Sequence, residues 1–385
     1  MKRTPVRAVA AMFLLAGIVF GGWATRVPTI KAKYGLSEAQ LGLVLLLVAG
    51  GGILAFAQAG RAGDIFGAGR ASRAFAIAAL LFMFLFSLAP TVWVLVPLLL
   101  LFGAGMGGMD VVMNSWATEI EEARGKAIMA RMHGLFSFGG AIGAGFAALC
   151  FSLGIGITLH YILVIILFGL PALWFAQIPW ESPETDATEA APLFALPRGA
   201  LLPVALIALL ATFGEGSTAD WSALYIIEQP LGNEQLGAIG FTLFSASMMT
   251  MRFLGDSLID RFGRVTMVRF CGAVSGVSGL IVTFAPNAYV ALLGFFLMGF
   301  GFALAFPIAM SRAAEQSPRT RGRAIASVAT LGYGGMLVAP PLIGFIAERS
   351  SLQMGFALIA FMAFLLIALA PSLRRAAPER VVTGG

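Results

Sequence analysis

Long apolar runs dominate the chain, and short polar segments separate them. A helix needs about 20 apolar residues to cross the hydrocarbon core of a bilayer, and twelve runs approach this length. They lie near residues 8–29, 38–59, 72–90, 92–116, 127–152, 158–178, 200–226, 234–255, 266–285, 289–313, 322–347 and 352–371. This pattern predicts an all-α membrane protein with twelve transmembrane helices.

One polar segment divides these runs into two sets of six. Residues 180–199 contain the acidic, proline-containing stretch WESPETDATEAAPLFALPR, which is typical of a linker. We therefore expect a six-helix N-terminal half at 1–179, a cytoplasmic linker at 180–199 and a six-helix C-terminal half at 200–385.

Composition and charge agree with this organisation. Hydrophobic residues make up 59% of the chain and charged residues 11%, whereas soluble domains carry about 25% charged residues. The net charge of +6 could indicate nucleic acid, but the basic residues are sorted by membrane side. Loops on the side of the N-terminus hold 21 Lys and Arg residues, Arg252 among them, and the opposite loops hold 4, Arg26 among them.

This asymmetry is a strong positive-inside signal. It predicts a multi-pass protein of the bacterial inner membrane with both termini in the cytoplasm and no nucleic-acid partner. The lipid bilayer is its expected environment, and a monomer is its expected functional unit.

The two halves repeat each other at an offset of about 196 residues. Asp64-Ile-Phe-Gly67 aligns with Asp260-Arg-Phe-Gly263, and the stretch RGKAI at 124–128 aligns with RGRAI at 321–325. Six-helix repeats in parallel orientation are an architecture of transporters, whose ligand sites lie near the bilayer midplane between the halves.

The loop GRAGDIFGAGR at 60–70, with its second copy DSLIDRFGR at 256–264, resembles the signature between helices two and three of the major facilitator superfamily. The resemblance covers essentially the whole chain. Within the superfamily, the stretches at 23–42, 109–140 and 214–225 resemble bacterial fucose-permease-like and rhizopine-transporter-like inner-membrane proteins. The resemblance implies the major facilitator fold and transport by alternating access.

The signature loops are expected to form the inner gate. The candidate residues are Gly60, Asp64, Gly67, Arg70, Asp256, Asp260, Arg261, Gly263 and Arg264. Carboxylates at such helix ends can accept hydrogen bonds from amides and pair with Arg, so Asp64 and Asp260 could hold the cytoplasmic ends of the helices together while the outside is open. The alternative is ordinary solvated charge.

Two carboxylates interrupt the seventh apolar run, Glu215 and Asp220. An ionisable residue at membrane depth is costly and usually functional. Glu215 would lie about 21 Å along its helix, and because burial favours the neutral carboxyl group, we expect it to bind proton or solute. A packing hydrogen bond is the alternative. Asp220 would lie about 7 Å further along, rotated by about 140°, and could pair with Arg26 as an outer gate; the alternative is that both charges are hydrated.

Further polar residues lie in other spans. Asp110 and Asn114 are four residues apart on one helix face, and with His133 they could form a proton relay or inner gate, although a lone histidine is often a packing residue. Tyr333 and Asn114 could donate hydrogen bonds to a solute. Trp221 could stack on a sugar ring or belong to the interfacial aromatic belt. The second histidine, His160, is expected at the rim.

Other chemical signals point to no enzyme and no cofactor. The run GAGMGG at 103–108 fits a dinucleotide motif, but it lies in an apolar span, where glycines favour close helix packing. Cys150 and Cys271 are far apart in apolar segments, and we expect no metal site. We find no nucleophile–base arrangement and no nucleotide-binding loop.

The sequence thus predicts a proton-coupled secondary transporter of a small polar organic solute such as a sugar or polyol. A proton-driven exporter of amphipathic drugs or metabolites is one alternative. A membrane receptor or scaffold that does not transport is another.

Overall fold

The computed structural model describes residues 3–126, 128–182, 195–315 and 318–374, and most of them are helical. The helices of the first half are α1 Pro5–Ala24, α2 Val27–Tyr34, α3 Glu38–Phe66, α4 Ala68–Ser87, α5 Val92–Arg124, α6 Met129–Ser152, α7 Ile157–Val164, the π-helical η1 Ile165–Gly169, and α8 Leu170–Phe175. Those of the second half are α9 Leu201–Glu228, α10 Glu234–Phe262, α11 Arg264–Thr283, α12 Ala288–Phe302, α13 Ala305–Ala314, α14 Pro318–Arg349, α15 Leu352–Leu369 and the 3-10 turn η3 Ala370–Leu373.

The predicted all-α membrane fold is confirmed. Each of the twelve apolar runs is helical, and four of them combine more than one element: α1 with α2, α7 with η1 and α8, α12 with α13, and α15 with η3. Eleven spans are long and apolar enough to cross a membrane in the described part of the chain. The run at 234–255 is the remaining one; it forms α10, which is 29 residues long but more polar.

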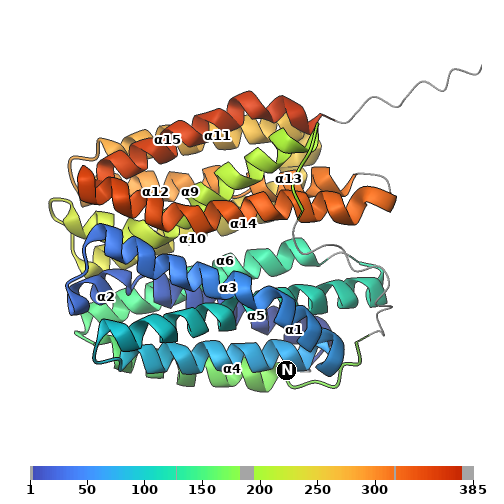
Figure 1. Ribbon diagram of the computed structural model, residues 1–385, viewed down its shortest axis with the longest axis horizontal. Helices are drawn as coiled ribbons and strands as arrows, with labels where there is room; N and C mark the ends of the chain where they lie inside the picture. Colours follow the sequence, from blue (N-terminus) through green and yellow to red (C-terminus); the bar gives the residue numbers. More distant parts are fainter. Residues whose placement is uncertain (1–2, 127, 183–194, 316–317, 375–385) are drawn as a thin grey trace, which may run out of the picture.

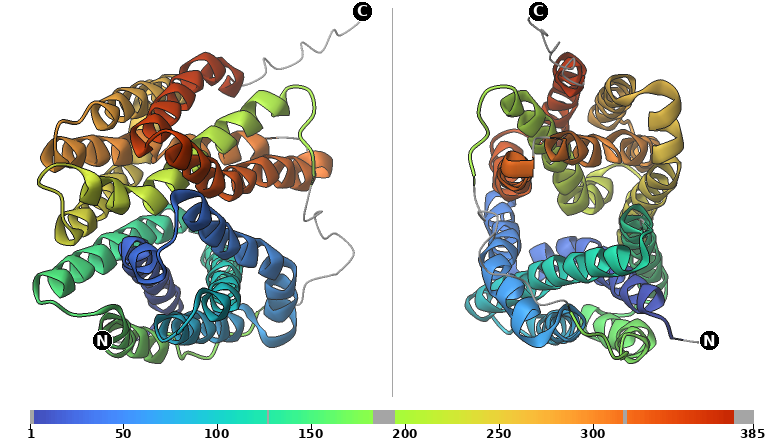
Figure 2. Two further views of the ribbon diagram at one scale, coloured as in Figure 1. Left: turned by 60° about the vertical axis from the view of Figure 1, so that its left-hand side comes forward. Right: turned by 90° about the vertical axis from the view of Figure 1, so that its right-hand side faces the viewer.

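The helices form two bundles that lie side by side. Figure 1 shows the helices that precede the linker, coloured blue to green, below those that follow it, coloured yellow-green to red. Figure 2 shows the same division from two other directions. We call the end of the bundles where α9 begins and α15 ends the terminal end, and the opposite end, where α3 and α10 begin, the far end.

Close approach of helix backbones requires glycine at several contacts inside the first half. A Cβ atom on Gly17 of α1 would lie 2.0 Å from the carbonyl oxygen of Phe136 in α6, and one on Gly103 of α5 would lie 2.0 Å from that of Val48 in α3. No side chain fits at such distances. The glycines of the run at 103–108 therefore serve helix packing, as the sequence predicted.

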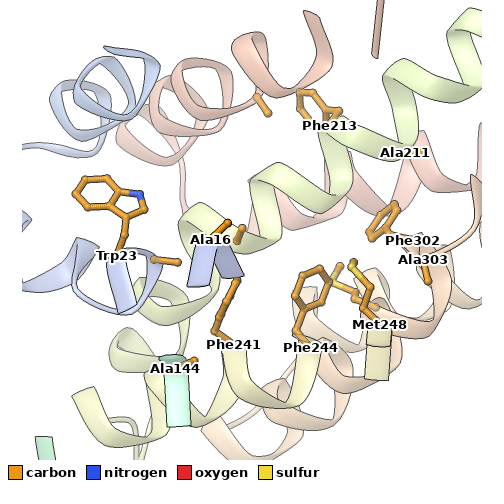
Figure 3. Packing of buried hydrophobic residues seen from close by; sticks show 14 of the residues in the cluster. Ala16, Trp23, Ala144, Ala211, Phe213, Phe241, Phe244, Met248, Phe302 and Ala303 are labelled. Carbon is orange, nitrogen blue, oxygen red and sulfur yellow. The ribbon is translucent and has the colours of Figure 1, made fainter. Parts of the chain in front are cut away.

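The two bundles meet along α6 with α10 and along α3 with α14. The rings of Phe20 in α1 and Phe241 in α10 are 6.0 Å apart between centroids. Figure 3 shows Phe241 close to Ala16, with Phe244 and Met248 further along α10 towards Phe302. The interface in this region is apolar, so a polar contact between the two halves is an exception there.

The far ends of α3 and α14 are tied together. The Glu348 carboxylate accepts hydrogen bonds from the Ser37 hydroxyl at 2.6 Å and from the Ala39 amide at 2.8 Å. A Cβ atom on Gly42 would lie 2.7 Å from the carbonyl oxygen of Pro340. The structure is therefore closed between these two helices at the far end.

Candidate functional site

An ion pair lies inside the membrane-spanning bundle where the two halves meet. Nη2 of Arg252 in α10 lies 3.1 Å and 3.3 Å from the two carboxylate oxygens of Glu215 in α9. Nη1 of Arg252 donates to the hydroxyl of Ser137 in α6, across the interface between the halves, at 2.7 Å. One guanidinium thus binds an anion of its own half and a hydroxyl of the other.

Glu215 is partly exposed in a helix segment that is otherwise almost entirely buried. Every residue of α9 from Leu210 to Ile226 is buried except Glu215 and Asp220. The Glu215 side chain is 26% exposed and that of Arg252 is 14% exposed. The pair is therefore enclosed by helices but open to a space that water or a solute could enter.

Arg252 is a residue whose role the sequence did not reveal, because it was counted with the cytoplasmic loops. It lies ten residues before the end of α10, about 15 Å inside the terminal end of that helix. Its position within the apolar run at 234–255 was the feature of the sequence that could have indicated an intramembrane arginine. Ser137 carried no signal at all, since a serine among glycines is ordinary in a membrane helix.

His133 lies one helical turn from Ser137. Its backbone carbonyl accepts the Ser137 hydroxyl at 3.3 Å, and its ring packs edge-on against Phe13 at 5.5 Å. The imidazole is within electrostatic reach of Arg252. His133 is thus close to the ion pair, but it is connected to it through its backbone rather than its ring.

The predicted Asp110–Asn114 set forms a local contact on α5. The Asn114 amide donates to the Asp110 carboxylate at 3.1 Å and to the Asp110 carbonyl at 2.8 Å. Tyr333 of α14 stacks edge-on against Phe56 of α3 at 5.2 Å and is within electrostatic reach of Asp110. These three polar side chains are partly exposed and come from both halves.

Trp221 does not line this space in the structure. Its side chain is 0% exposed, and its indole Nε1 has no hydrogen-bond partner among the described residues. A ring that is fully enclosed by other side chains cannot stack on a solute, so the predicted stacking surface is absent from this conformation.

The predicted pair of Arg26 and Asp220 is wrong for this structure. The Arg26 guanidinium donates to His160 Nδ1 at 3.2 Å and to the Ile155 carbonyl at 2.7 Å, and it lies 3.9 Å from the Phe151 ring centroid. Asp220 has no hydrogen bond or ion pair with any described residue. Symmetry placed the two residues at equivalent heights, but α6, α7 and the connection between them supply the partners of Arg26.

His160, expected at the rim, lies in the first turn of α7. It is 0% exposed, and its bond to Arg26 leaves its Nε2 without a partner among the described residues. Because Nδ1 accepts a hydrogen bond from arginine, the proton of the neutral ring belongs on Nε2.

The signature loops share one backbone geometry but not the predicted contacts. Gly67 and Gly263, 196 residues apart, have φ values of +83° and +78°, which strongly favour glycine. Asp64 and Asp260 form no ion pair with described residues, and because their pairing is predicted for the state open at the opposite end, it stays a prediction. Instead, Arg264 pairs with Glu315, with an N–O distance of 2.5 Å.

In the first loop, a different group binds the start of α4. The Ser182 hydroxyl accepts the Ala68 amide at 2.9 Å and donates to Glu119 at 2.9 Å, while the Trp180 indole donates to the same carboxylate at 2.7 Å. The beginning of the linker is thereby fixed to the first signature loop.

The described residues hold no cluster of three or more His, Cys, Asp or Glu side chains that could bind a metal. Cys150 and Cys271 are both free and buried. The polar side chains of the bundle interior can bind charge and donate hydrogen bonds, and the Arg252–Ser137 hydrogen bond connects the Glu215–Arg252 ion pair of the second half to the first half.

The chain matches a family model described as Major Facilitator Superfamily, over residues 9–237 and 204–384. It is 38% identical over 376 residues to the uncharacterized transporter y4wD of Sinorhizobium fredii, covering 97% of this chain and 99% of that one. It is 31% identical over 355 residues to the membrane protein MosC of Rhizobium meliloti, covering 91% and 86%.

Solved structures show the same fold at low identity. The nucleoside transporter NupG superposes with a TM-score of 0.75 at 13% identity, covering 96% of this chain and 99% of that one. The Escherichia coli fucose:proton symporter FucP superposes with a TM-score of 0.66 at 15% identity, covering 97% and 99%.

Proposed function

The chain belongs to the Major Facilitator Superfamily, as a multi-pass membrane transporter rather than an enzyme, and from this premise we propose a specific mode of transport. It moves a small polar organic solute, such as a sugar, a polyol or a derivative, by alternating access, with protons as the coupling ion. The observation that carries the proposal is the contact of Arg252 with Glu215 in its own half and with Ser137 in the other.

The ion pair couples charge to the interface between the halves. While Glu215 is ionised, it holds one edge of the Arg252 guanidinium, and the other edge is aimed at Ser137. A proton on Glu215 removes the charge that orients Arg252, because a neutral carboxyl group is a much weaker partner for guanidinium. The bond from Arg252 to Ser137 then loses its support, and the α6–α10 contact is free to change.

The polar set supports a hydroxylated solute. Asn114 and Tyr333 are partly exposed and can donate hydrogen bonds, and Glu215 and Arg252 can bind the ends of a polar molecule. Tyr333 with Phe56 offers an aromatic edge. Charged, amide and phenolic groups together suit a small molecule with several hydroxyl groups better than an apolar drug.

We further propose that the terminal end is cytoplasmic, in a bacterial inner membrane, and that the monomer is the functional unit. Removing the intramembrane Arg252 and the buried Arg26 from the loop count leaves 20 basic residues on the terminal side and 3 on the far side, which is still a strong bias. The closure of the far end would then make this an inward-facing conformation. In the opposite state, Asp64 and Asp260 would gain the partners that they lack here.

Transport in proteoliposomes with an imposed pH gradient tests the proposal. Wild-type protein should accumulate a labelled sugar or polyol from a panel in response to an inward proton gradient. Glu215→Gln should abolish accumulation and leave exchange between equal solute pools measurable. Asp220→Asn is the matched control, since it removes the neighbouring unpaired carboxylate of the same helix, and it should accumulate solute with the wild-type pH dependence.

Three outcomes would contradict the proposal. Unchanged proton-driven accumulation by Glu215→Gln would remove Glu215 from the coupling step. Proton-driven efflux of amphipathic cations with no sugar flux would indicate the exporter. Solute binding without flux in any direction would indicate a receptor or scaffold.

A further inference from the structure

Asp110 is a second carboxylate inside the membrane-spanning bundle, and it has no cationic partner in the described part of the chain. Its Oδ1 atom accepts a hydrogen bond from the Asn114 amide at 3.1 Å. Its Oδ2 atom accepts none from a described residue, and the residue is partly exposed. An ionisable group at membrane depth is costly and usually functional. The coupling step assigned to Glu215 gives Asp110 no task, so its presence needs a separate explanation.

The nearby arginines do not neutralise Asp110. The helices α3 and α4 both pack against α5. Arg73 of α4 donates to the backbone carbonyl at the end of α8 at 3.0 Å, and Arg61 of α3 is exposed nearer the terminal end. In the second half, Arg252 is bound to Glu215. The ion pair is therefore balanced in charge, whereas Asp110 forms no ion pair with any described residue.

Two aromatic rings lie near this carboxylate. Tyr333 of α14 is within electrostatic reach of Asp110, and its ring centroid is 5.2 Å from that of Phe56 in α3. The packing of α3 on α5 places Phe56 at the level of Asp110, because one turn earlier a Cβ atom on Gly107 would lie 2.4 Å from Cα of Gly52. Aromatic faces attract cations. The carboxylate and the two rings thus complement the same kind of group.

Asp110 and the ion pair lie at similar depth in the bundle. Asp110 and Glu215 are each about 21 Å from the terminal end of their helices, α5 and α9. Helix α14 packs on both α3 and α9, and a Cβ atom on Gly216 would lie 3.7 Å from Cγ of Met336, one turn from Tyr333. A solute that enters between the halves would therefore meet balanced charge in the second half and uncompensated negative charge in the first.

We propose that the solute is a hydroxylated amine, protonated at neutral pH, and that Asp110 binds its ammonium group. Oδ2 would accept a hydrogen bond from the ammonium group while Asn114 holds Oδ1, and Phe56 and Tyr333 would lie beside the cation. The hydroxyl groups of the solute would remain for the ion pair and the other donors. This inference rests on the proposed function, because it names the class of solute carried at that site and makes Asp110 the residue that selects it.

Matched pairs of solutes test the inference with purified full-length protein. D-glucose is compared with D-glucosamine, and D-glucitol with D-glucamine, at neutral pH and constant ionic strength. N-acetyl-D-glucosamine keeps the substituent but removes the charge. Thermal unfolding at increasing solute concentration gives the half-saturating concentration, and counterflow in proteoliposomes without a pH gradient reports transport. We expect each amine to saturate at a concentration at least about tenfold below that of its neutral partner, as a charged contact implies.

Variants of Asp110 assign the preference to this residue. Asp110→Asn should raise the half-saturating concentration of each amine at least about tenfold and leave that of its neutral partner nearly unchanged. Asp110→Glu keeps the charge and should retain most of the preference. Glu122→Gln is the matched control, since it removes an exposed carboxylate of the same helix and should bind as wild type does. Because amine and neutral solute are compared within each variant, a general loss of stability cannot imitate the expected result.

Several results would overturn the inference. They are equal affinity for amines and their neutral partners, an amine preference that survives in Asp110→Asn, and no saturable response to any amine. Equal affinity for apolar amines without hydroxyl groups would instead indicate a carrier of amphipathic cations.

Failure of this inference can be told apart from failure of the proposed function. Proton-driven accumulation of a neutral sugar or polyol with no amine preference would reject the inference and leave the proposed function in place. Amine binding that depends on Asp110 but produces no flux would reject the proposed function and leave Asp110 as the residue that binds the amine.

Discussion

The two halves of this transporter have the same backbone geometry in their signature loops, but their intramembrane carboxylates have different kinds of partner. Gly67 and Gly263 hold the same backbone geometry 196 residues apart. In the interior, the first half keeps its carboxylate within one helix, where Asp110 contacts Asn114. The second half pairs Glu215 with Arg252 across two helices and extends the contact to Ser137 in the first half.

This difference shows where a repeated fold acquires its function. Backbone geometry is shared because both copies must make the same turn between packed helices. Intramembrane charges need not be shared, because their partners depend on the side chains nearby: Asn114 of the same helix for Asp110, and Arg252 of another helix for Glu215. A site between the halves therefore becomes asymmetric even though its scaffold is symmetric.

The largest expected effect comes from breaking the central pair from one side. Arg252→Gln should lower the free energy of unfolding by about 1–3 kcal/mol, because it leaves an ionised carboxylate without its partner. The double variant Glu215→Gln/Arg252→Gln should lose less than the sum of the two single variants. Chemical unfolding in detergent micelles measures all three. Additive losses would mean that the contact does not contribute to stability.

The next effect concerns the far-end closure between the halves. Glu348→Gln should weaken the hydrogen bonds to Ser37 and Ala39 and increase the population open at the far end several-fold, because each bond now has a charged acceptor. Spin labels introduced by Gln40→Cys and Arg349→Cys, both at exposed positions, report the separation of α3 and α14. An unchanged distance distribution would show that apolar packing alone closes this end.

The signature loops offer a matched comparison of the halves. Gly67→Ala and Gly263→Ala should each destabilise the protein by about 1–3 kcal/mol, because a side chain at such a φ value is strained. Ser182→Ala should cost about 0.5–1.5 kcal/mol, because it removes the hydroxyl that accepts the Ala68 amide at the first loop. Unfolding midpoints of the three variants provide the comparison. A large difference between the two glycine variants would show that the loops are not equivalent.

The smallest expected effect is a coupling energy near zero between Arg26 and Asp220. In a double-mutant cycle, Arg26→Leu and Asp220→Asn should be additive within about 0.5 kcal/mol, because the two side chains do not meet. The cycle of Arg26→Leu with His160→Phe is the positive control and should show a clear coupling energy, since those residues are hydrogen-bonded. Strong coupling between Arg26 and Asp220 would mean that they pair in another conformation.

The helices, their membrane-spanning length and the family were all predictable from the amino-acid sequence. These predictions rest on local patterns: apolar runs of spanning length, the bias of basic residues and the two copies of the signature loop. Such patterns can be recognised without knowing which helices pack together. The depth of Glu215 was also predictable, because the rise of a helix converts residue number into height.

The contacts between polar side chains could not be predicted without the packing of the helices. Arg252 was counted as a loop charge and proved to be the partner of Glu215, and Arg26 was paired with Asp220 but binds His160 instead. Trp221 was placed against a solute and is enclosed. The reason is physical: position along a helix is fixed by the sequence, but the direction in which a side chain points and the helix that it faces depend on how twelve helices pack, and no single segment contains that information.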